Sequence, residues 1–280
     1  MIKILDCTLR DGGYINNWDF GRKNAQNIIS MLQKALIDYI EIGFITTEKS
    51  TRNQTLFDSF EKIKEFIPKN YDKSKLCAMI TIGKFPISLV PNVSSSPIGT
   101  LRVIFKKNSQ AEVLEYAEQI KEKGYKLFIN PTFTDQYSDE EFISLLKKIE
   151  KISPYAVSVV DSMGVMKEND ILRLYHLIDN NLSSNIALCF HSHNNLQLSF
   201  SNAQSLIKIC QNNHHSHNLN HQQINNLLST HNNLIINIIN HSPNFNHHIQ
   251  NLNSNHSLLF LNHNFHNFLK IIQINNILLI

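Results

Sequence analysis

The sequence at residues 6–13 is DCTLRDGG, and it follows a short, mainly apolar run at residues 2–5. An apolar run that ends in charged residues and two glycines is typical of a buried strand that opens into a loop. Arg10 and Asp11 are therefore predicted to lie at the carboxyl end of a first strand.

A second polar stretch, CFHSHNN, occupies residues 189–195. Residues two apart share a face of an extended chain, so His191 and His193 can reach one ion together. One carboxylate and two imidazoles, with coordination positions left open, form a common catalytic site for a divalent metal such as Mn, Mg or Zn. We therefore predict that Asp11, His191 and His193 are metal ligands. The alternative is a pair of polar rim histidines and a local ion pair between Arg10 and Asp11.

Composition excludes several classes of protein. The net charge of +3 over 280 residues is too small to indicate a nucleic-acid or membrane partner. The four cysteines form no CxxC pair, which favours reduced, mostly buried thiols and a cytoplasmic location. The N-terminus lacks a secretory apolar region, and no apolar stretch is long enough to span a bilayer.

Apolar runs alternate with amphipathic stretches up to residue 210. Strands are predicted at 2–6, 39–45, 75–82, 100–105, 126–130, 156–160 and 185–191. Helices are predicted at 20–35, 53–67, 110–123, 139–152, 168–182 and 196–210. Seven β–α units favour an α/β fold, a (β/α)8 TIM barrel, with its site at the carboxyl ends of the strands. A doubly wound open sheet is the rival, but DCTLRDGG is not the Gly-rich phosphate turn of that fold.

The chain changes character at residue 211. Residues 211–280 contain no Gly, Ala, Val, Asp or Glu, but 20 Asn and 11 of the 14 His. All five missing residue types have codons that begin with G. We therefore predict a catalytic domain at 1–210 and an Asn/His-rich low-complexity tail at 211–280, either frameshifted or disordered. The barrel would then be incomplete at strand 8.

The motifs DCTLRDGG, YIEIGFI (39–45), VDSMG (160–164) and HSHNNLQLSFSNA (191–203) resemble the pyruvate carboxyltransferase or HMG-CoA-lyase-like family of metal-dependent TIM barrels. The form RDGGYINNWDF looks most like its 4-hydroxy-2-oxovalerate aldolase branch. The resemblance implies that Asp11, His191 and His193 are the metal ligands and that Arg10 stabilises a developing enolate. Two features depart from the family. Tyr14 stands where the aldolases carry a histidine, and the Gly-rich segment that supplies an Asn ligand in the lyases has no counterpart.

Further polar residues are candidates for the pocket. Tyr14 is a candidate proton donor or acceptor, or else an aromatic lid beside Trp18. Glu41, which faces inward from the second strand, either orients Arg10 or forms a structural ion pair. The remaining candidates for substrate binding are residues at strand ends: Asn130, Asp161 and Asn195. Alternatively, each of them is a structural residue of a loop or a helix cap, and Asn195 is expected to cap a helix that begins at Leu196.

These observations predict a cytoplasmic, metal-dependent aldolase or lyase that acts on a 2-oxo acid through an enolate. A Claisen-type acyltransferase that uses acyl-CoA is the second candidate. The third is an inactive barrel truncated before strand 8. The expected partner is the small-molecule substrate, with a homo-oligomer or a partner dehydrogenase as further alternatives.

Overall fold

A computed structural model describes residues 2–214 and 277–279 of the chain. Its strands follow the predicted apolar runs closely. They are β1 (Ile4–Asp6), β2 (Tyr39–Ile45), β3 (Leu56–Phe57), β4 (Leu76–Thr81), β5 (Thr100–Phe105), β6 (Lys126–Pro131), β7 (Ala156–Asp161), β8 (Ala187–Ser192) and β9 (Ile277–Leu279). The seven predicted strands are thus all confirmed, whereas β3 and β9 were not predicted.

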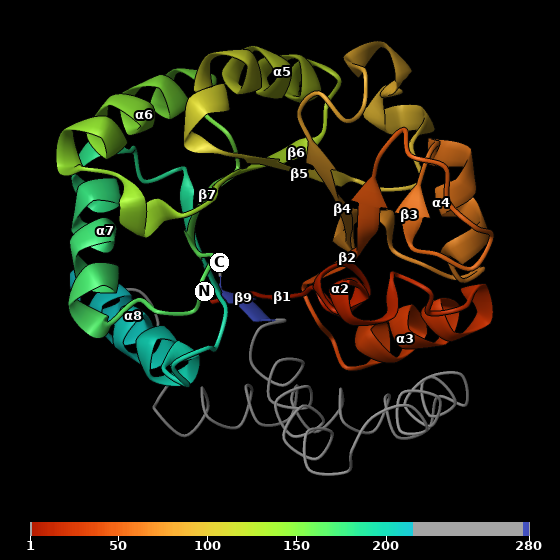
Figure 1. Ribbon diagram of the computed structural model, residues 1–280, viewed down its shortest axis with the longest axis horizontal. Helices are drawn as coiled ribbons and strands as arrows, with labels where there is room; N and C mark the ends of the chain where they lie inside the picture. The colour runs from red at the N-terminus through yellow and green to blue at the C-terminus, as the bar shows by residue number, and fades with distance from the viewer. Residues whose placement is uncertain (1, 215–276, 280) are drawn as a thin grey trace, which may run out of the picture.

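The strands form a ring with helices on its outside (Figure 1). β1, β2, β4, β5, β6, β7 and β8 are parallel neighbours in that order, and β3 adds to the outer edge of β2. The short β9 lies between β8 and β1 and is antiparallel to both. The predicted TIM-barrel architecture is confirmed. It departs from a complete (β/α)8 barrel at the eighth strand position, which the antiparallel β9 occupies. Within residues 2–214 and 277–279, no parallel eighth β–α unit occurs.

The predicted low-complexity tail lies mostly outside the described residues, which resume only at β9. Both predictions for the tail, a frameshifted reading and a disordered segment, fall on residues outside the described part of the chain.

The longer helices cover the outer face of the ring: α3 (Arg22–Lys34), α4 (Phe60–Phe66), α5 (Gln110–Glu122), α6 (Asp139–Ile152), α7 (Glu168–Asn181) and α8 (Ser199–His214). Two short helices, α1 (Thr8–Asp11) and α2 (Gly13–Asn16), follow β1 directly and lie at the carboxyl end of that strand. The sequence predicted the exact bounds of α6. In the structure, Ser138 and Glu141 form a capping box at its start. α4 is shorter than predicted, since Ser59 caps it and β3 uses the residues before it.

Two apolar layers hold the barrel together. The larger one packs the outer face of the sheet against the helices, and includes Ile29 and Leu32 of α3. The second fills the ring itself: Leu5, Cys7, Tyr39, Cys77, Phe128, Ala156 and Cys189. All seven side chains are almost completely buried, so the interior is a packed core and not a pore.

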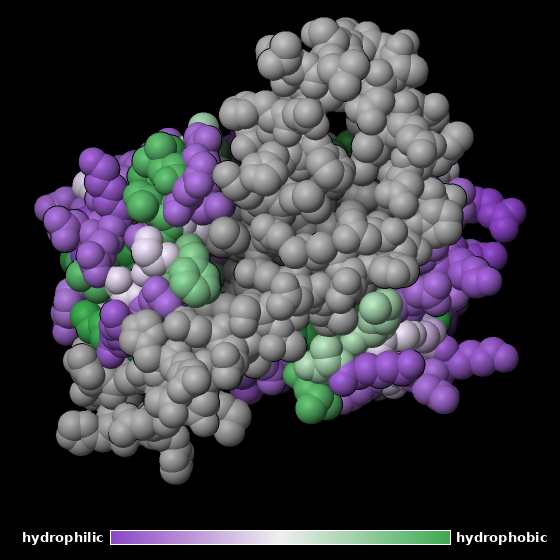
Figure 2. Space-filling model, turned by 90° about the horizontal axis from the view of Figure 1, so that it is seen from below, coloured by the Kyte–Doolittle hydropathy of each residue, from purple (hydrophilic) through white to green (hydrophobic). Residues whose placement is uncertain are grey.

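The four cysteines are free thiols, three of them buried, as predicted. In the view of Figure 2, the described surface is mainly hydrophilic, with small hydrophobic groups separated by polar residues. None of the helices in the described part of the chain is long and apolar enough to cross a membrane.

Candidate metal centre

The barrel brings together the three residues predicted as metal ligands. Asp11 ends α1, directly after β1, while His191 lies in β8 and His193 follows it. Asp11 Oδ2 is 3.8 Å from His191 Nε2 and 3.6 Å from His193 Nε2. One ligand atom from each residue lies within 4.8 Å of the others. This spacing suits three ligands that share one ion at bond lengths of about 2.0–2.2 Å.

The backbone of Asp161 fixes the orientation of His193. The Asp161 carbonyl oxygen lies 2.7 Å from His193 Nδ1 and also accepts a hydrogen bond from the His193 backbone N–H at 3.2 Å. Because a carbonyl oxygen can only accept, Nδ1 must carry a proton. The lone pair of the neutral ring is therefore on Nε2, which faces Asp11, as in metal-ligating histidines.

The Asp161 carboxylate organises the loop that follows β7. It accepts hydrogen bonds from the backbone N–H groups of Val165 and Met166 at 3.0 and 3.2 Å. Within this loop Gly164 has φ +66°, and a Cβ there would lie 2.5 Å from the backbone nitrogen of Asn195. A glycine is thus required both for the conformation and for the close approach of the two loops. The turn after β7 braces the turn that carries His193.

The electrostatics of the three residues suit a cation. Burial alone would raise the pKa of Asp11, but the charge of Arg10 and a hydrogen bond from His193 lower it well below its usual value. Burial lowers the pKa of His191 far below its usual value, so this imidazole is neutral at pH 7. Burial also opposes protonation of His193, but its hydrogen bond to Asp11 raises the pKa. The Asp11 carboxylate is thus kept ionised beside two imidazoles, as a cation site requires.

Arg10 lies beside the three residues and is held on two sides. Its Nη1 donates to Asp11 Oδ1 at 2.5 Å, and its Nε donates to Glu41 Oε2 at 2.7 Å. The side chain is only 4% exposed, and its Nη2 has no hydrogen-bond partner among the described residues. A buried guanidinium with one free edge is suited to bind an anionic oxygen next to the metal centre.

A polar network continues from Arg10 into the barrel. Glu41 Oε1 lies 2.7 Å from Arg102 Nη1, and Arg102 Nη2 donates to Asn130 Oδ1 at 3.0 Å. Ser158 Oγ donates to the same Asn130 oxygen at 2.6 Å. Arg102, Glu41 and Ser158 are fully buried and Asn130 almost so. Glu41 therefore pairs with both Arg10 and Arg102, which fits either of its predicted roles, while the side chain of Asn130 lies within the interior.

Tyr14 lies on α2, which crosses the ring beside β2 (Figure 1). Its ring packs edge to face on Trp18 and Phe44, with centroid separations of 4.8 and 6.3 Å. Trp18 Nε1 donates to the carbonyl oxygen of Arg10 at 2.7 Å, which ties this aromatic group to the site. Tyr14 itself remains 65% exposed. The predicted contact with Trp18 is present, and Phe44 is an unpredicted member of the group.

Asn195 is exposed in the turn after His193, and the predicted helix cap is wrong. The helix begins at Ser199, and it is Asn194 whose Oδ1 accepts the Ser199 N–H at 3.1 Å. The predicted cap is the neighbouring asparagine, and the predicted start of the helix is three residues too early. Asn195 is left free on the surface next to the metal centre.

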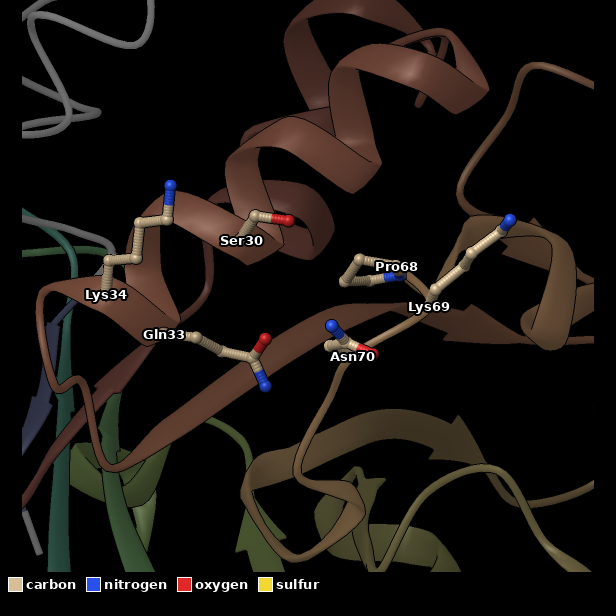
Figure 3. A pocket seen from close by; sticks show the side chains of 6 residues that line it. All are labelled: Ser30, Gln33, Lys34, Pro68, Lys69 and Asn70. Atoms are coloured by element: carbon tan, nitrogen blue, oxygen red, sulfur yellow. The ribbon is translucent and has the colours of Figure 1, made fainter.

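A pocket of about 510 Å³ lies away from this centre, between the last turns of α3 and the segment after α4 (Figure 3). Its lining residues are Ser30, Gln33, Lys34, Pro68, Lys69 and Asn70. They precede β2 and β4, at the amino-terminal end of the barrel, and none was predicted as a site residue.

The fold and the site together define a class: a (β/α) barrel with an Asp–His–His cluster and a buried arginine at the carboxyl ends of its strands. The sequence model of the HMGL-like family matches residues 1–208, and the chain belongs to this family.

Individual relatives are identical to the chain at about a quarter of the aligned positions. A 4-hydroxy-2-oxovalerate aldolase of Geobacillus genomosp. 3 is 26% identical over 211 residues, which cover 74% of this chain and 61% of the relative. An (R)-citramalate synthase, CimA of Methanocaldococcus jannaschii, is 26% identical over 218 residues and is covered to 42%. The chain thus spans less than two thirds of the length of either relative.

The fold is also that of solved structures. The N-terminal domain of an aldolase candidate from Bacteroides vulgatus aligns with a TM-score of 0.61 and 23% identity, covering 84% of this chain and 87% of that domain.

Proposed function

We propose that this chain is a divalent-metal-dependent carbon–carbon lyase of the aldolase type. Its substrate would be a 4-hydroxy-2-oxo acid, cleaved to pyruvate and an aldehyde. The observation that carries the proposal is the convergence of Asp11, His191 and His193 within 4.8 Å beside Arg10. Membership in the HMGL-like family and similarity to a 4-hydroxy-2-oxovalerate aldolase support it.

The donor set fits a divalent ion of the Mn, Mg or Zn kind. It combines one carboxylate with two imidazoles, of which His191 is neutral and His193 is oriented by the Asp161 carbonyl. When bound, such an ion would polarise the keto group of the substrate as a Lewis acid. The three protein ligands leave coordination positions for the keto oxygen and the carboxylate of a 2-oxo acid.

Arg10 would stabilise the charge that develops during cleavage. When the bond between C3 and C4 breaks, its electron pair moves into the keto group and places negative charge on the C2 oxygen. The free Nη2 of Arg10 is available to donate to this oxygen, and Glu41 holds the guanidinium in place from the opposite side. A pre-positioned cation lowers the barrier because it needs no rearrangement during the reaction.

Tyr14 is our candidate for proton transfer. Partial desolvation raises the pKa of its phenol, against the opposing effect of Arg10, although the side chain is largely exposed. The hydroxyl is therefore protonated at neutral pH. It can then donate a proton to C3 of the pyruvate enolate. Among the other candidates, Glu41 and Asn130 would act through Arg10 and Arg102, and Asp161 through His193. Asn195 is exposed at the mouth of the barrel, so among these candidates it is the residue that would contact the substrate.

The proposal is tested by pyruvate release from 4-hydroxy-2-oxopentanoate with added Mn²⁺, in the wild type and in Asp11→Ala. Asp58→Ala, which removes an exposed carboxylate, is the matched control. We expect release by the wild type and the control and a loss of at least about 100-fold in Asp11→Ala. Equal release by Asp11→Ala would contradict the proposal.

A Claisen-type acyltransferase is the second candidate, because the citramalate synthase is a relative. Free CoA released from acyl-CoA in the presence of a 2-oxo acid, without pyruvate release, would favour it. An aggregated chain without bound metal would favour the third candidate, the inactive truncated barrel.

We also propose that the catalytic domain ends near residue 210 and that the protein is cytoplasmic. The family match that ends at residue 208 supports the boundary, and the free thiols support a reducing compartment. Resequencing the gene across codons 205–220 tests the frameshift: an in-frame reading would overturn it. On the resemblance alone, we also propose that the protein acts with a partner dehydrogenase or as a homo-oligomer.

A further inference from the structure

Exposed apolar side chains gather around the metal centre. Among the described residues, nine large hydrophobic side chains are exposed, and five of them lie on α2 or on the loops that follow β7 and β8. These five, which we call the apolar rim, are Tyr14, Ile15, Met163, Val165 and Leu196, with exposures of 65, 38, 51, 37 and 49%. Exposed apolar groups that collect at one place mark a binding surface, whereas scattered ones need no explanation.

The rim residues are tied to the metal ligands by short stretches of chain and by hydrogen bonds. Leu196 is three residues from His193, and its N–H donates to the Gly164 carbonyl at 2.9 Å. Met163 and Val165 flank that glycine, so the loops after β7 and β8 present their apolar residues together.

Tyr14 and Ile15 follow Asp11 on the other side of the centre, on α2. Figure 1 shows β7, β9 and β1 on one continuous arc of the ring, with α2 at its end. The rim therefore flanks the metal centre on two sides.

The chemistry of the substrate decides which of its atoms meets the rim. A 2-oxo acid would be anchored by its carboxylate and keto oxygen, which are the groups that the ion and Arg10 bind. Everything beyond C4 must then extend away from the anchored end, toward the mouth of the barrel. Water and polar side chains suit a hydrophilic substituent there, whereas Met, Leu and Val side chains suit an alkyl group. The flexible Met163 adapts to chains of different length.

We propose that the apolar rim selects 4-hydroxy-2-oxo acids with an extended alkyl substituent at C4, so that the aldehyde product is an aliphatic aldehyde longer than acetaldehyde. This inference rests on the proposed lyase function and adds the substrate class. In the reaction, solvent water takes up the proton of the C4 hydroxyl while the C3–C4 bond breaks and the aldehyde forms. The electron pair of that bond forms the pyruvate enolate, with its negative charge on the C2 oxygen. Tyr14 then donates a proton to C3, which gives pyruvate, and regains a proton from water.

The test compares substrates with methyl, ethyl, propyl and butyl groups at C4, measured as pyruvate release. For the wild type with Mn²⁺, kcat/KM is expected to rise about two- to four-fold per methylene, the upper value corresponding to full burial of the added group. Leu196→Ser and Met163→Ser should flatten this dependence. Leu36→Ser, an exposed residue after α3, is the matched control and should keep the full dependence.

A second measurement does not require turnover. Calorimetry with 2-oxobutanoate, 2-oxopentanoate and 2-oxohexanoate should give affinity that rises with chain length in the wild type and not in Leu196→Ser. Affinity or kcat/KM that is independent of chain length, or equal slopes in wild type and Leu196→Ser, would overturn the rim proposal while the lyase stands. Chain-length-dependent binding without pyruvate release from any substrate would support the rim and contradict the lyase.

Discussion

Glu41 carries the buried charge balance on which the position of Arg10 depends. It is fully buried and lies 2.7 Å from both Arg10 Nε and Arg102 Nη1. With Asp11 included, two cations face two anions in a region that excludes water. The substitution Glu41→Gln preserves the shape of the side chain but leaves one buried positive charge without compensation.

Removing one partner of a buried ion pair costs about 3–5 kcal/mol. For a domain of this size, each kcal/mol shifts the melting temperature by about 2–4 °C, so Glu41→Gln should melt about 6–20 °C below the wild type. The effect should persist in 1 M salt, because buried charges are weakly screened. Thermal denaturation followed by circular dichroism, at low and high salt, measures both quantities.

The matched control is Glu65→Gln. Glu65 also pairs with an arginine, Arg22, at 2.9 Å, but its side chain is 52% exposed. Exposed pairs contribute less than about 1 kcal/mol, so this variant should melt close to the wild type. A Glu41→Gln variant as stable as the wild type, or an equal loss in Glu65→Gln, would refute the argument from buried charge.

Three further predictions concern the loop after β7 and two titrating groups. Gly164→Ala should weaken Mn²⁺ binding in calorimetry at least about ten-fold, since its Cβ would press on the turn that carries His193; unchanged affinity would show that the two loops adjust freely. Metal affinity should fall as the pH decreases through the raised pKa of His193, starting above the ordinary histidine value of about 6.5, because the ion must displace its proton. Calorimetric affinities that stay constant from pH 8 to 6 would contradict this. Burial raises the pKa of Asp6 to about 7, so the folded state binds a proton that the unfolded chain releases above about pH 4. The free energy of unfolding should therefore decrease from pH 4 to 7, and urea denaturation of Asp6→Asn should show a smaller decrease.

The sequence predicted the barrel and its metal cluster because both depend on simple patterns. Strands buried on both faces must be apolar throughout, which made seven of them visible. A closed ring of parallel strands then brings all carboxyl ends to one mouth. Asp11 and His193 could thus be placed together although they are far apart in the sequence, and β1 and β8 are indeed separated by one strand in the ring.

The inward direction of Glu41 was predicted, but the contacts that other groups make in the interior were not. Arg102 sits in an apolar strand, and only the structure shows that it faces inward to Glu41. The same holds for the orienting role of the Asp161 carbonyl, since a backbone atom leaves no residue signature. The antiparallel β9 could not be expected, because a three-residue strand in an Asn-rich stretch has no distinctive pattern.

The account depends above all on one ion being held by Asp11, His191 and His193. Its most direct test is the number of Mn²⁺ ions bound per chain after loading and desalting, determined by elemental analysis in wild type, Asp11→Ala and Asp58→Ala. We predict about one ion in the wild type and in Asp58→Ala, and almost none in Asp11→Ala, because three protein ligands are the usual minimum for a catalytic site. The same metal content in Asp11→Ala as in the wild type would contradict the assignment.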